Sequence, residues 1–177
     1  MKSIVRATLL LWVSLSAGIS IVGANSPDCR KLVFNRYCLG GDASLLPASP
    51  GTQQLPGDGL HEFEETHQGK TVRLALDNGQ LVTVVRYETP GGWLNFTAWK
   101  ARLDRLYGSG KDLGHFPAYA SSRSSRLNAI NAGKGYAHMS WPQDGWSVEL
   151  IWNHRDRIEL RYQLDPPTLV PDNPEGL

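Results

Sequence analysis

The most constraining feature of the sequence is a regular alternation of apolar and polar residues near its C-terminal end. Successive side chains of a β-strand point to opposite faces, so apolar residues at every second position predict strands that share one apolar face. Turn-forming residues separate the runs, which predicts a three-stranded antiparallel meander over a hydrophobic core. The apolar positions are Ala137, Met139 and Trp141, then Trp146, Val148, Leu150 and Trp152, then Ile158, Leu160 and Tyr162.

A β-hairpin is predicted in the stretch 71–88, which reads TVRLALDNGQLVTVVRYE. Its centre is Asn78-Gly79, a pair that favours the type I′ turn because both central residues of that turn need a positive φ. A two-residue loop sets the register of the flanking strands. It pairs Leu76 with Leu81, Leu74 with Thr83, and Val72 with Val85.

A helix is predicted between these two strand regions. Apolar residues in the stretch 95–110 recur at the spacing of one helical face. Asn95 is a candidate N-cap and Gly108 a candidate residue just beyond the C-terminus. A second, short helix is possible over 125–132, within a segment (109–134) that otherwise has no clear period and can be either a solvated crossover or a functional loop. The predicted apolar stripe is Phe96, Trp99, Leu103, Leu106 and Tyr107.

These elements predict an α+β fold in a single small domain. The order β-β-α-β-β-β is most simply one antiparallel sheet of about five strands packed on one main helix. The chain then divides into a signal peptide (1–24), a cysteine-containing segment with a Gly/Pro-rich linker (25–60), the α+β domain (61–165) and an irregular tail (166–177).

Both cysteines lie in a ten-residue stretch, CRKLVFNRYC, from Cys29 to Cys38. We expect a disulfide; a metal clip and a free or intermolecular thiol are the alternatives. A straight helix would place the two Cα atoms about 13 Å apart, and a disulfide needs them within about 7 Å. The segment must therefore turn, and Asn35-Arg36 is the expected place.

The first 24 residues have the pattern of a secretory signal peptide. Lys2 and Arg6 precede an apolar run, and Val22 and Ala24 are the small residues expected before a cleavage site. Serines and glycines dilute the run, which disfavours the alternative of a membrane anchor. We expect an exported protein, periplasmic or secreted, with no stable membrane anchor after cleavage.

The net charge gives no reason to expect a polyanionic partner. Residues 1–24 hold two of the 18 Lys and Arg and none of the 17 Asp and Glu, so the remainder has a formal net charge of −1. Nucleic acid is therefore not an expected partner.

No sequence motif for catalysis or for a cofactor is present, so the catalytic and metal candidates depend on strand geometry alone. His138 and Glu149 fall on equivalent faces of neighbouring predicted strands, and such a pair can perform acid–base chemistry or can be a simple cross-strand pair. His61, Glu65 and His67 share one side if their stretch is extended, and could hold a metal only if it bends. We expect no cofactor.

Tryptophans next to turns are the candidates for binding. Trp93 follows Pro90-Gly91-Gly92 and Trp146 follows a turn; Arg123 and Arg126 lie in the serine-rich part of 109–134. Tryptophan is frequent at the centre of protein interfaces, although a small core uses it equally well.

The leading functional hypothesis is a non-catalytic binding module of the cell envelope or secreted space. It would engage a protein partner, as an inhibitor, immunity or accessory factor, through the sheet edge and the 109–134 segment. A small hydrolase that uses the histidine and glutamate residues is the alternative. A structural envelope component is the third hypothesis.

Overall fold

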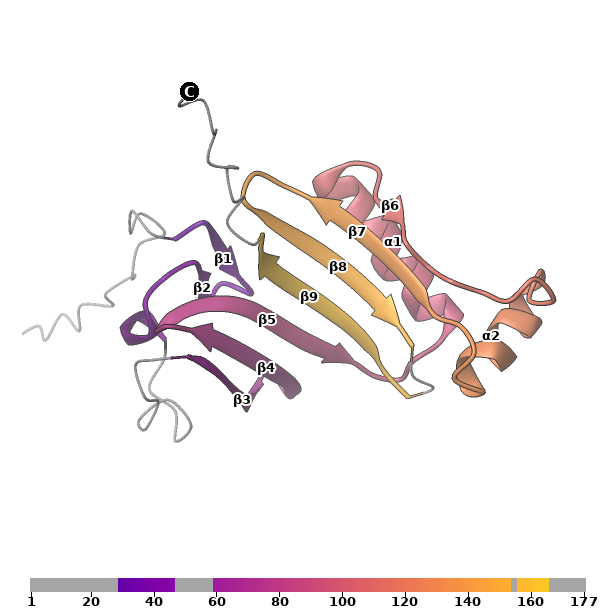
Figure 1. Ribbon diagram of the computed structural model, residues 1–177, viewed down its shortest axis with the longest axis horizontal. Helices are drawn as coiled ribbons and strands as arrows, with labels where there is room; N and C mark the ends of the chain where they lie inside the picture. The colour runs from indigo at the N-terminus through magenta and orange to yellow at the C-terminus, as the bar shows by residue number, and fades with distance from the viewer. Residues whose placement is uncertain (1–28, 47–58, 154–155, 166–177) are drawn as a thin grey trace, which may run out of the picture.

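The computed structural model describes residues 29–46, 59–153 and 156–165. They form a seven-stranded antiparallel sheet and a separate two-stranded sheet, with two α-helices and a short 3-10 helix (Figure 1). The predicted signal peptide (1–24) and C-terminal tail (166–177) lie outside the described residues, as does most of the Gly/Pro-rich linker.

The strands of the main sheet lie in the order β3-β4-β5-β9-β8-β7-β6. The chain builds β3, β4 and β5, crosses behind the sheet through α1, starts again at the far edge with β6, and returns until β9 pairs with β5 (Figure 1). The elements are β1 (Lys31–Val33), β2 (Tyr37–Leu39), the 3-10 helix (Ala43–Leu45), β3 (Leu60–His67), β4 (Lys70–Asp77), β5 (Gln80–Glu88), α1 (Trp93–Tyr107), β6 (Lys111–Asp112), α2 (Arg123–Asn131), β7 (Ala137–Pro142), β8 (Trp146–Trp152) and β9 (Ile158–Leu164).

The predicted meander is confirmed as β7, β8 and β9. Met139 pairs with Leu150, which pairs with Leu160, and all three are buried on the face that α1 covers. Pairing of β9 with β5 then joins the meander to the first half of the sheet, so that one core runs under both halves.

The strand count is larger than the predicted five because both edge strands were missed. Residues 60–67, in which the sequence indicates only the metal candidates His61, Glu65 and His67, form β3 along the whole length of β4. Strand β6 has two residues. Edge strands tolerate charged and short sequences, so their apolar signal is weak.

The Asn78-Gly79 turn is confirmed, and both residues have positive φ, 48° and 78°. The predicted register beyond it is wrong, because a β-bulge interrupts the pairing between Ala75 and Leu76. One extra residue in a strand moves each later side chain of that strand to the opposite face of the sheet, relative to an unbulged hairpin. Leu74 therefore pairs with Val84 and Val72 with Arg86, where the unbulged hairpin predicts Thr83 and Val85.

Helix α1 lies against one face of the sheet, over β7 and β8. It begins at Trp93, two residues before the predicted N-cap Asn95, whose side-chain amide instead donates to the carbonyl oxygen of Pro90 (2.7 Å). The predicted stripe changes accordingly: Trp93 joins Phe96 and Leu103 against the core, and Leu106 is 62% exposed.

The predicted Cys29–Cys38 disulfide is present, with the two Cα atoms 5.3 Å apart. It closes the β1–β2 hairpin, whose turn at residues 34–36 includes the expected position. This hairpin packs beside α1 on the same face of the sheet. The backbone amide of Gly40 donates to the Leu81 carbonyl (2.8 Å), and the Tyr37 hydroxyl donates to the Glu65 carboxylate.

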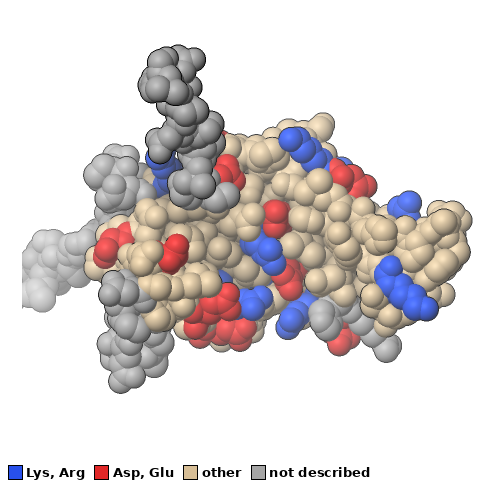
Figure 2. Space-filling view, viewed as in Figure 1, with Lys and Arg blue, Asp and Glu red and all other residues tan. Residues whose placement is uncertain are grey.

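The opposite face of the main sheet is not covered by either helix or by the hairpin (Figure 1). Lysines and arginines alternate with acidic residues across its middle (Figure 2). One row crosses six strands in register, from Glu64 through Arg73, Val85, Arg161 and Glu149 to Ser140.

Candidate functional site

A groove of about 1090 Å³ lies between the start of α1 and helix α2. Residues 89–93, which link β5 to α1, form one wall together with Asp156 from the turn before β9. Helix α2 forms the other wall along its length, with Ser122 at its N-cap, then Arg123, Ser124 and Leu127, and Asn131 at its last position. The groove therefore brings together three segments that are far apart in the sequence.

Local sequence explains where strand β5 ends and where the helices α1 and α2 begin. Pro90 and two glycines follow β5, and proline lacks the amide that a continuing strand would need. Gly92 then adopts a φ of 159° and precedes α1 without any side-chain cap. Helix α2 instead begins with a capping box, in which Ser122 and Ser125 bond reciprocally to each other's backbone amides.

The floor of the groove rests on an aromatic cluster. The half-buried ring of Trp93 lies against Phe96 and the fully buried Trp152, with ring centroids 6.4 Å and 6.2 Å away. The guanidinium of Arg126 lies over Trp93 (6.0 Å) and over Phe116 (5.1 Å). Its Nε also donates to the carbonyl oxygen of Ala120 (3.3 Å). These contacts hold the Trp93 ring and α2 in a fixed relation.

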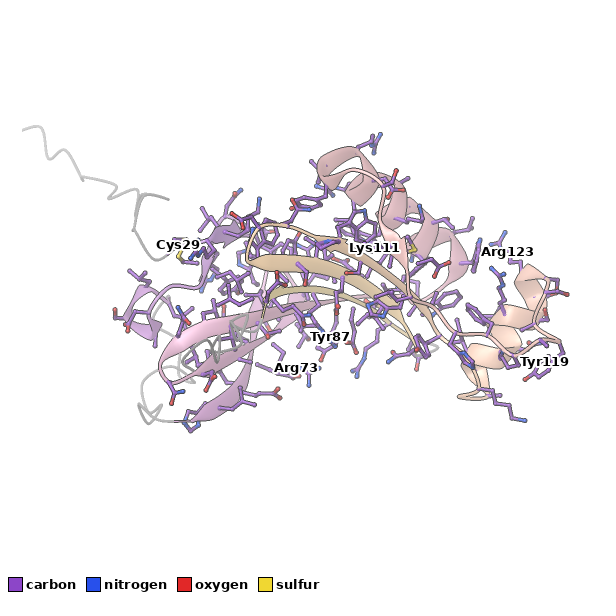
Figure 3. The ribbon with its side chains drawn as sticks, turned by 45° about the horizontal axis from the view of Figure 1, so that its top comes forward. Cys29, Arg73, Tyr87, Lys111, Tyr119 and Arg123 are labelled. Atoms are coloured by element: carbon purple, nitrogen blue, oxygen red, sulfur yellow. A yellow bond between two sulfur atoms is a disulfide. The ribbon has the colours of Figure 1, made fainter. Side chains whose placement is uncertain are left out.

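Arg123 differs from Arg126, although both belong to α2. It is exposed at the start of the helix, on the side that faces α1 (Figure 3). Within the described part of the chain it makes no hydrogen bond, ion pair or ring contact. Leu127, one turn further along the same wall, is 38% exposed. The wall of α2 thus offers an unpaired cation next to an apolar side chain.

Three of the four binding candidates from the sequence lie at this groove. Trp93 and Arg123 line it, and Arg126 supports its floor. Trp146 is elsewhere, between Tyr107 and Tyr162, with ring centroids 5.9 Å and 6.3 Å away, and Lys31 lies over its ring (5.4 Å). That environment favours a packing role for Trp146.

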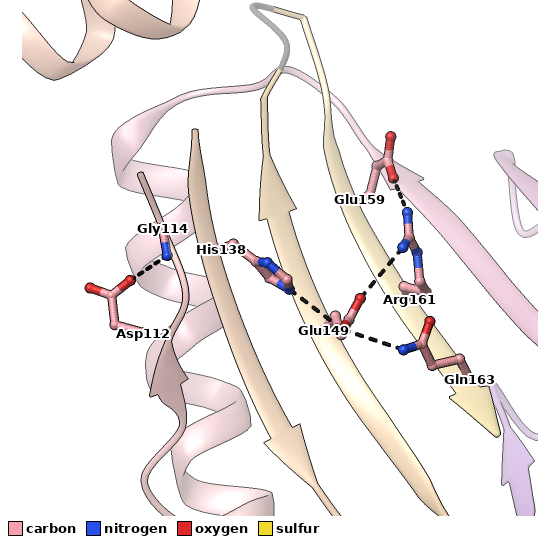
Figure 4. Close-up of polar contacts among 7 residues, drawn as sticks. All are labelled: Asp112, Gly114, His138, Glu149, Glu159, Arg161 and Gln163. Atoms are coloured by element: carbon pink, nitrogen blue, oxygen red, sulfur yellow. Dashed lines mark hydrogen bonds and ion pairs between the residues drawn. The ribbon is translucent and has the colours of Figure 1, made fainter. Parts of the chain in front are cut away.

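The catalytic candidates His138 and Glu149 lie together on the open face of the sheet (Figure 4). Nε2 of His138 is 3.5 Å from Oε1 of Glu149, and the second carboxylate oxygen is 3.5 Å from Arg161. Arg161 also pairs with Glu159 at 3.1 Å. The predicted cross-strand proximity of the histidine and the glutamate is therefore observed, as part of a longer chain of charges.

The electrostatics of this network favour an ionised carboxylate. Interaction with His138 is the main cause that lowers the pKa of Glu149, with Arg161 adding to it against the opposing effect of burial. An ionised Glu149 can orient His138 but cannot donate a proton at neutral pH. The neighbouring hollow is only about 270 Å³, and its lining includes Arg161 and Gln163 but neither His138 nor Glu149. The pair therefore lines neither this hollow nor the groove beside α2.

The metal candidates His61, Glu65 and His67 lie on one face of β3, as their alternation predicts. Strand β3 pairs with β4 in one continuous register, so His61 is paired with Leu76 and His67 with Lys70, toward opposite ends of the strand. Glu65 accepts from Tyr37 and lies 3.3 Å from the Arg36 guanidinium. No group of three or more metal-ligating side chains occurs in the described ranges 29–46, 59–153 and 156–165.

Leu127, Asn131 and Asp156 were missed by sequence reasoning. Leu127 and Asn131 follow Arg123 at spacings of four and eight, which is one face of a helix, so a predicted helix starting at 123 would have grouped them. Asp156 lies in a turn, and no pattern in the sequence indicates which loops meet across the fold.

Comparison with protein-family models, with curated proteins and with solved structures finds no match to this chain.

Proposed function

We propose that this protein is an exported, non-catalytic binding module that holds a segment of a protein partner in the groove between residues 89–93 and α2. The observation that carries the proposal is the make-up of the groove. Trp93, backed by the buried Trp152, and the exposed Leu127 line it together with Arg123, which has no partner among the described residues.

The size and the chemistry of the groove favour a polypeptide over a small molecule. Its volume of about 1090 Å³ is slightly above the range for small-ligand pockets, about 300–1,000 Å³. Serine, asparagine and threonine residues line it together with the apolar residues. An apolar centre with a polar rim is typical of protein interfaces, and tryptophan and arginine are the commonest residues at their energetic centres.

The free edge of the sheet is a less suitable surface for a partner strand. Strand β3 is the last strand on its side of the sheet, so its outer row of backbone groups has no strand partner in the part of the chain that the structure describes. It carries Glu62, Glu64 and Glu65 within four positions. Charged side chains on an edge strand disfavour pairing with another strand. We therefore place the partner at the groove rather than at the sheet edge.

Export is part of the proposal. The Cys29–Cys38 disulfide is consistent with an oxidising compartment, where such bonds persist. No helix in the described residues is long and apolar enough to cross a membrane. The signal-peptide pattern of residues 1–24 supports export independently of the disulfide.

A hydrolase remains the second candidate because His138 and Glu149 are in contact on the open face. Against it, Glu149 is shared among His138, Arg161 and Gln163. A carboxylate with three partners is suited to holding neighbouring strands together. The binding proposal gives the open face no catalytic role.

Site-specific photo-crosslinking in the native cell tests the proposal. A photoreactive benzoylphenylalanine placed at Leu127 should crosslink to one protein partner. The matched control is the same residue at Leu106, which is also exposed but lies at the far end of α1. Equal adducts from both positions, or none from Leu127, would refute the groove as the binding surface.

A further inference from the structure

We propose that the groove selects a segment in which an acidic side chain lies two positions from an apolar side chain, with the carboxylate paired to Arg123. This inference rests on the proposed function and adds the chemistry that the partner must carry. It follows from the order of side chains along one face of α2.

The groove-facing side of α2 has a fixed sequence of chemistries. Arg123, Leu127 and Asn131 follow at intervals of four residues and all line the groove. Residues four apart on a helix lie about 6 Å from each other on the same face. The wall therefore presents a cation, then an apolar side chain, then an amide, in steps of about 6 Å.

An extended peptide matches this spacing. Its side chains on one face recur every second residue, at about 6.6 Å. A segment lying along α2 can therefore place one side chain on Arg123 and the side chain two positions away on Leu127 and the Trp93 ring. A polar side chain at the next such position reaches Asn131.

The charge distribution identifies the first side chain as acidic. Arg123 has no partner within the described residues, and a guanidinium pairs with a carboxylate through two parallel hydrogen bonds. Arg126, fixed over Trp93, adds a second positive charge on the same helix. The first turn of α2 contains no acidic residue to offset them.

Among the described residues that line the groove, Asp156 is the only acidic one, and it lies on the opposite wall. A partner carboxylate is therefore attracted to the α2 side and repelled from the sheet side. The two walls together fix which side of the bound segment faces α2.

Selection from a random heptapeptide display library on the folded, disulfide-bonded protein tests this inference. We expect the selected peptides to share an Asp or Glu two positions from an aliphatic or aromatic residue. Arg123→Glu should weaken their binding at least tenfold, and exchanging the peptide's acidic residue for lysine should restore binding to this variant.

Arg105→Glu provides the matched control. Arg105 is an exposed arginine in the last turn of α1, and the same charge change there should alter the affinity less than twofold. Thermal melts of both variants verify that they are folded.

The outcomes separate this inference from the function on which it rests. Peptides that lose binding with Leu127→Glu but carry no acidic residue, or that ignore Arg123→Glu, would refute the acidic motif and leave the groove as a binding site. Selected peptides whose binding is unaffected by Leu127→Glu would refute the groove itself, and the acidic motif with it.

Discussion

Gly79 turns the chain between β4 and β5 with a φ of 78°, in the left-handed region that a β-branched residue tolerates poorly. Its carbonyl oxygen also accepts from the amide of Ala43 (2.8 Å), so the same turn holds the segment that follows β2. Gly79 thus links the β4–β5 hairpin to the segment that follows the disulfide-closed β1–β2 hairpin.

Gly79→Val should lower the free energy of unfolding by at least about 1 kcal/mol, because valine strains a positive φ. Urea titration measures the loss. Gly79→Asn is the control, since asparagine accepts this conformation more readily, and it should lose less. Equal midpoints for the valine variant and the wild type would show that the turn does not depend on glycine.

Trp146 is expected to stabilise the fold rather than bind a partner. Its ring packs between Tyr107 and Tyr162, so Trp146→Ala should cost about 3 kcal/mol of stability. Trp146→Phe, which keeps a ring in the stack, should cost less. A full-stability Trp146→Ala variant with lost peptide binding would reverse this assignment.

At the scale of single elements, the start of α2 determines the shape of the groove wall. The sequence predicted a short helix over 125–132, and the helix spans Arg123–Asn131. The early start depends on the reciprocal hydrogen bonds between Ser122 and Ser125. The sequence does not show which of its four nearby serines is the N-cap, because each is an equally good cap. The two-residue difference decides whether Arg123 belongs to a loop or to the groove-facing side of a helix.

Ser122→Ala should destabilise the protein by about 1 kcal/mol and loosen α2, since it removes the cap of that helix. Ser121→Ala, next to it and also exposed, is the control and should be neutral within about 0.5 kcal/mol. Thermal unfolding and the far-ultraviolet circular dichroism of the two variants distinguish them. Equal losses would argue that the box does not hold the helix start.

The charge network between β7, β8 and β9 should affect stability in acid. The pKa of Glu149 is lowered in the folded state, so the unfolded chain binds this proton more readily. The resulting stability is present above the ordinary carboxyl pKa of 4.5. It is lost as the pH falls through the lower folded value.

In Glu149→Gln, the unfolding midpoint should therefore fall less steeply than in the wild type between about pH 5 and pH 3. Glu64→Gln on the edge strand β3 is the control for removing a carboxylate from the same face of the sheet. Urea midpoints across this range test the difference. Parallel curves for Glu149→Gln and the wild type would show that the network does not stabilise the fold.

At the scale of the whole molecule, local patterns predicted the elements better than their arrangement. Alternation identified β7, β8 and β9, and Asn78-Gly79 identified the β4–β5 turn. The pairing of β9 with β5 joins segments about 75 residues apart, which no local period encodes. The bulge at Ala75–Leu76 lies within the β4–β5 hairpin, where the alternation of residues gives no sign of it.

For the groove too, the sequence indicates individual residues but not how the fold brings them together. Trp93, Arg123 and Arg126 could be named from residue type and position, but the groove needs a loop after β5, the start of α2 and the turn before β9 in one place. Trp146 has the same local signal as Trp93, a tryptophan after a turn. Only the fold separates the two, because α1 and Tyr162 cover one ring, and the other lines the groove.

Amide hydrogen exchange with and without the crosslinked partner, or a selected peptide, tests the central claim most directly because it reports on every candidate surface at once. The predicted result is slower exchange confined to residues 89–93 and α2, with β3 and the open face unchanged. Protection along Leu60–His67 without protection of α2 would contradict it, and would show that the partner binds as an added strand at the sheet edge.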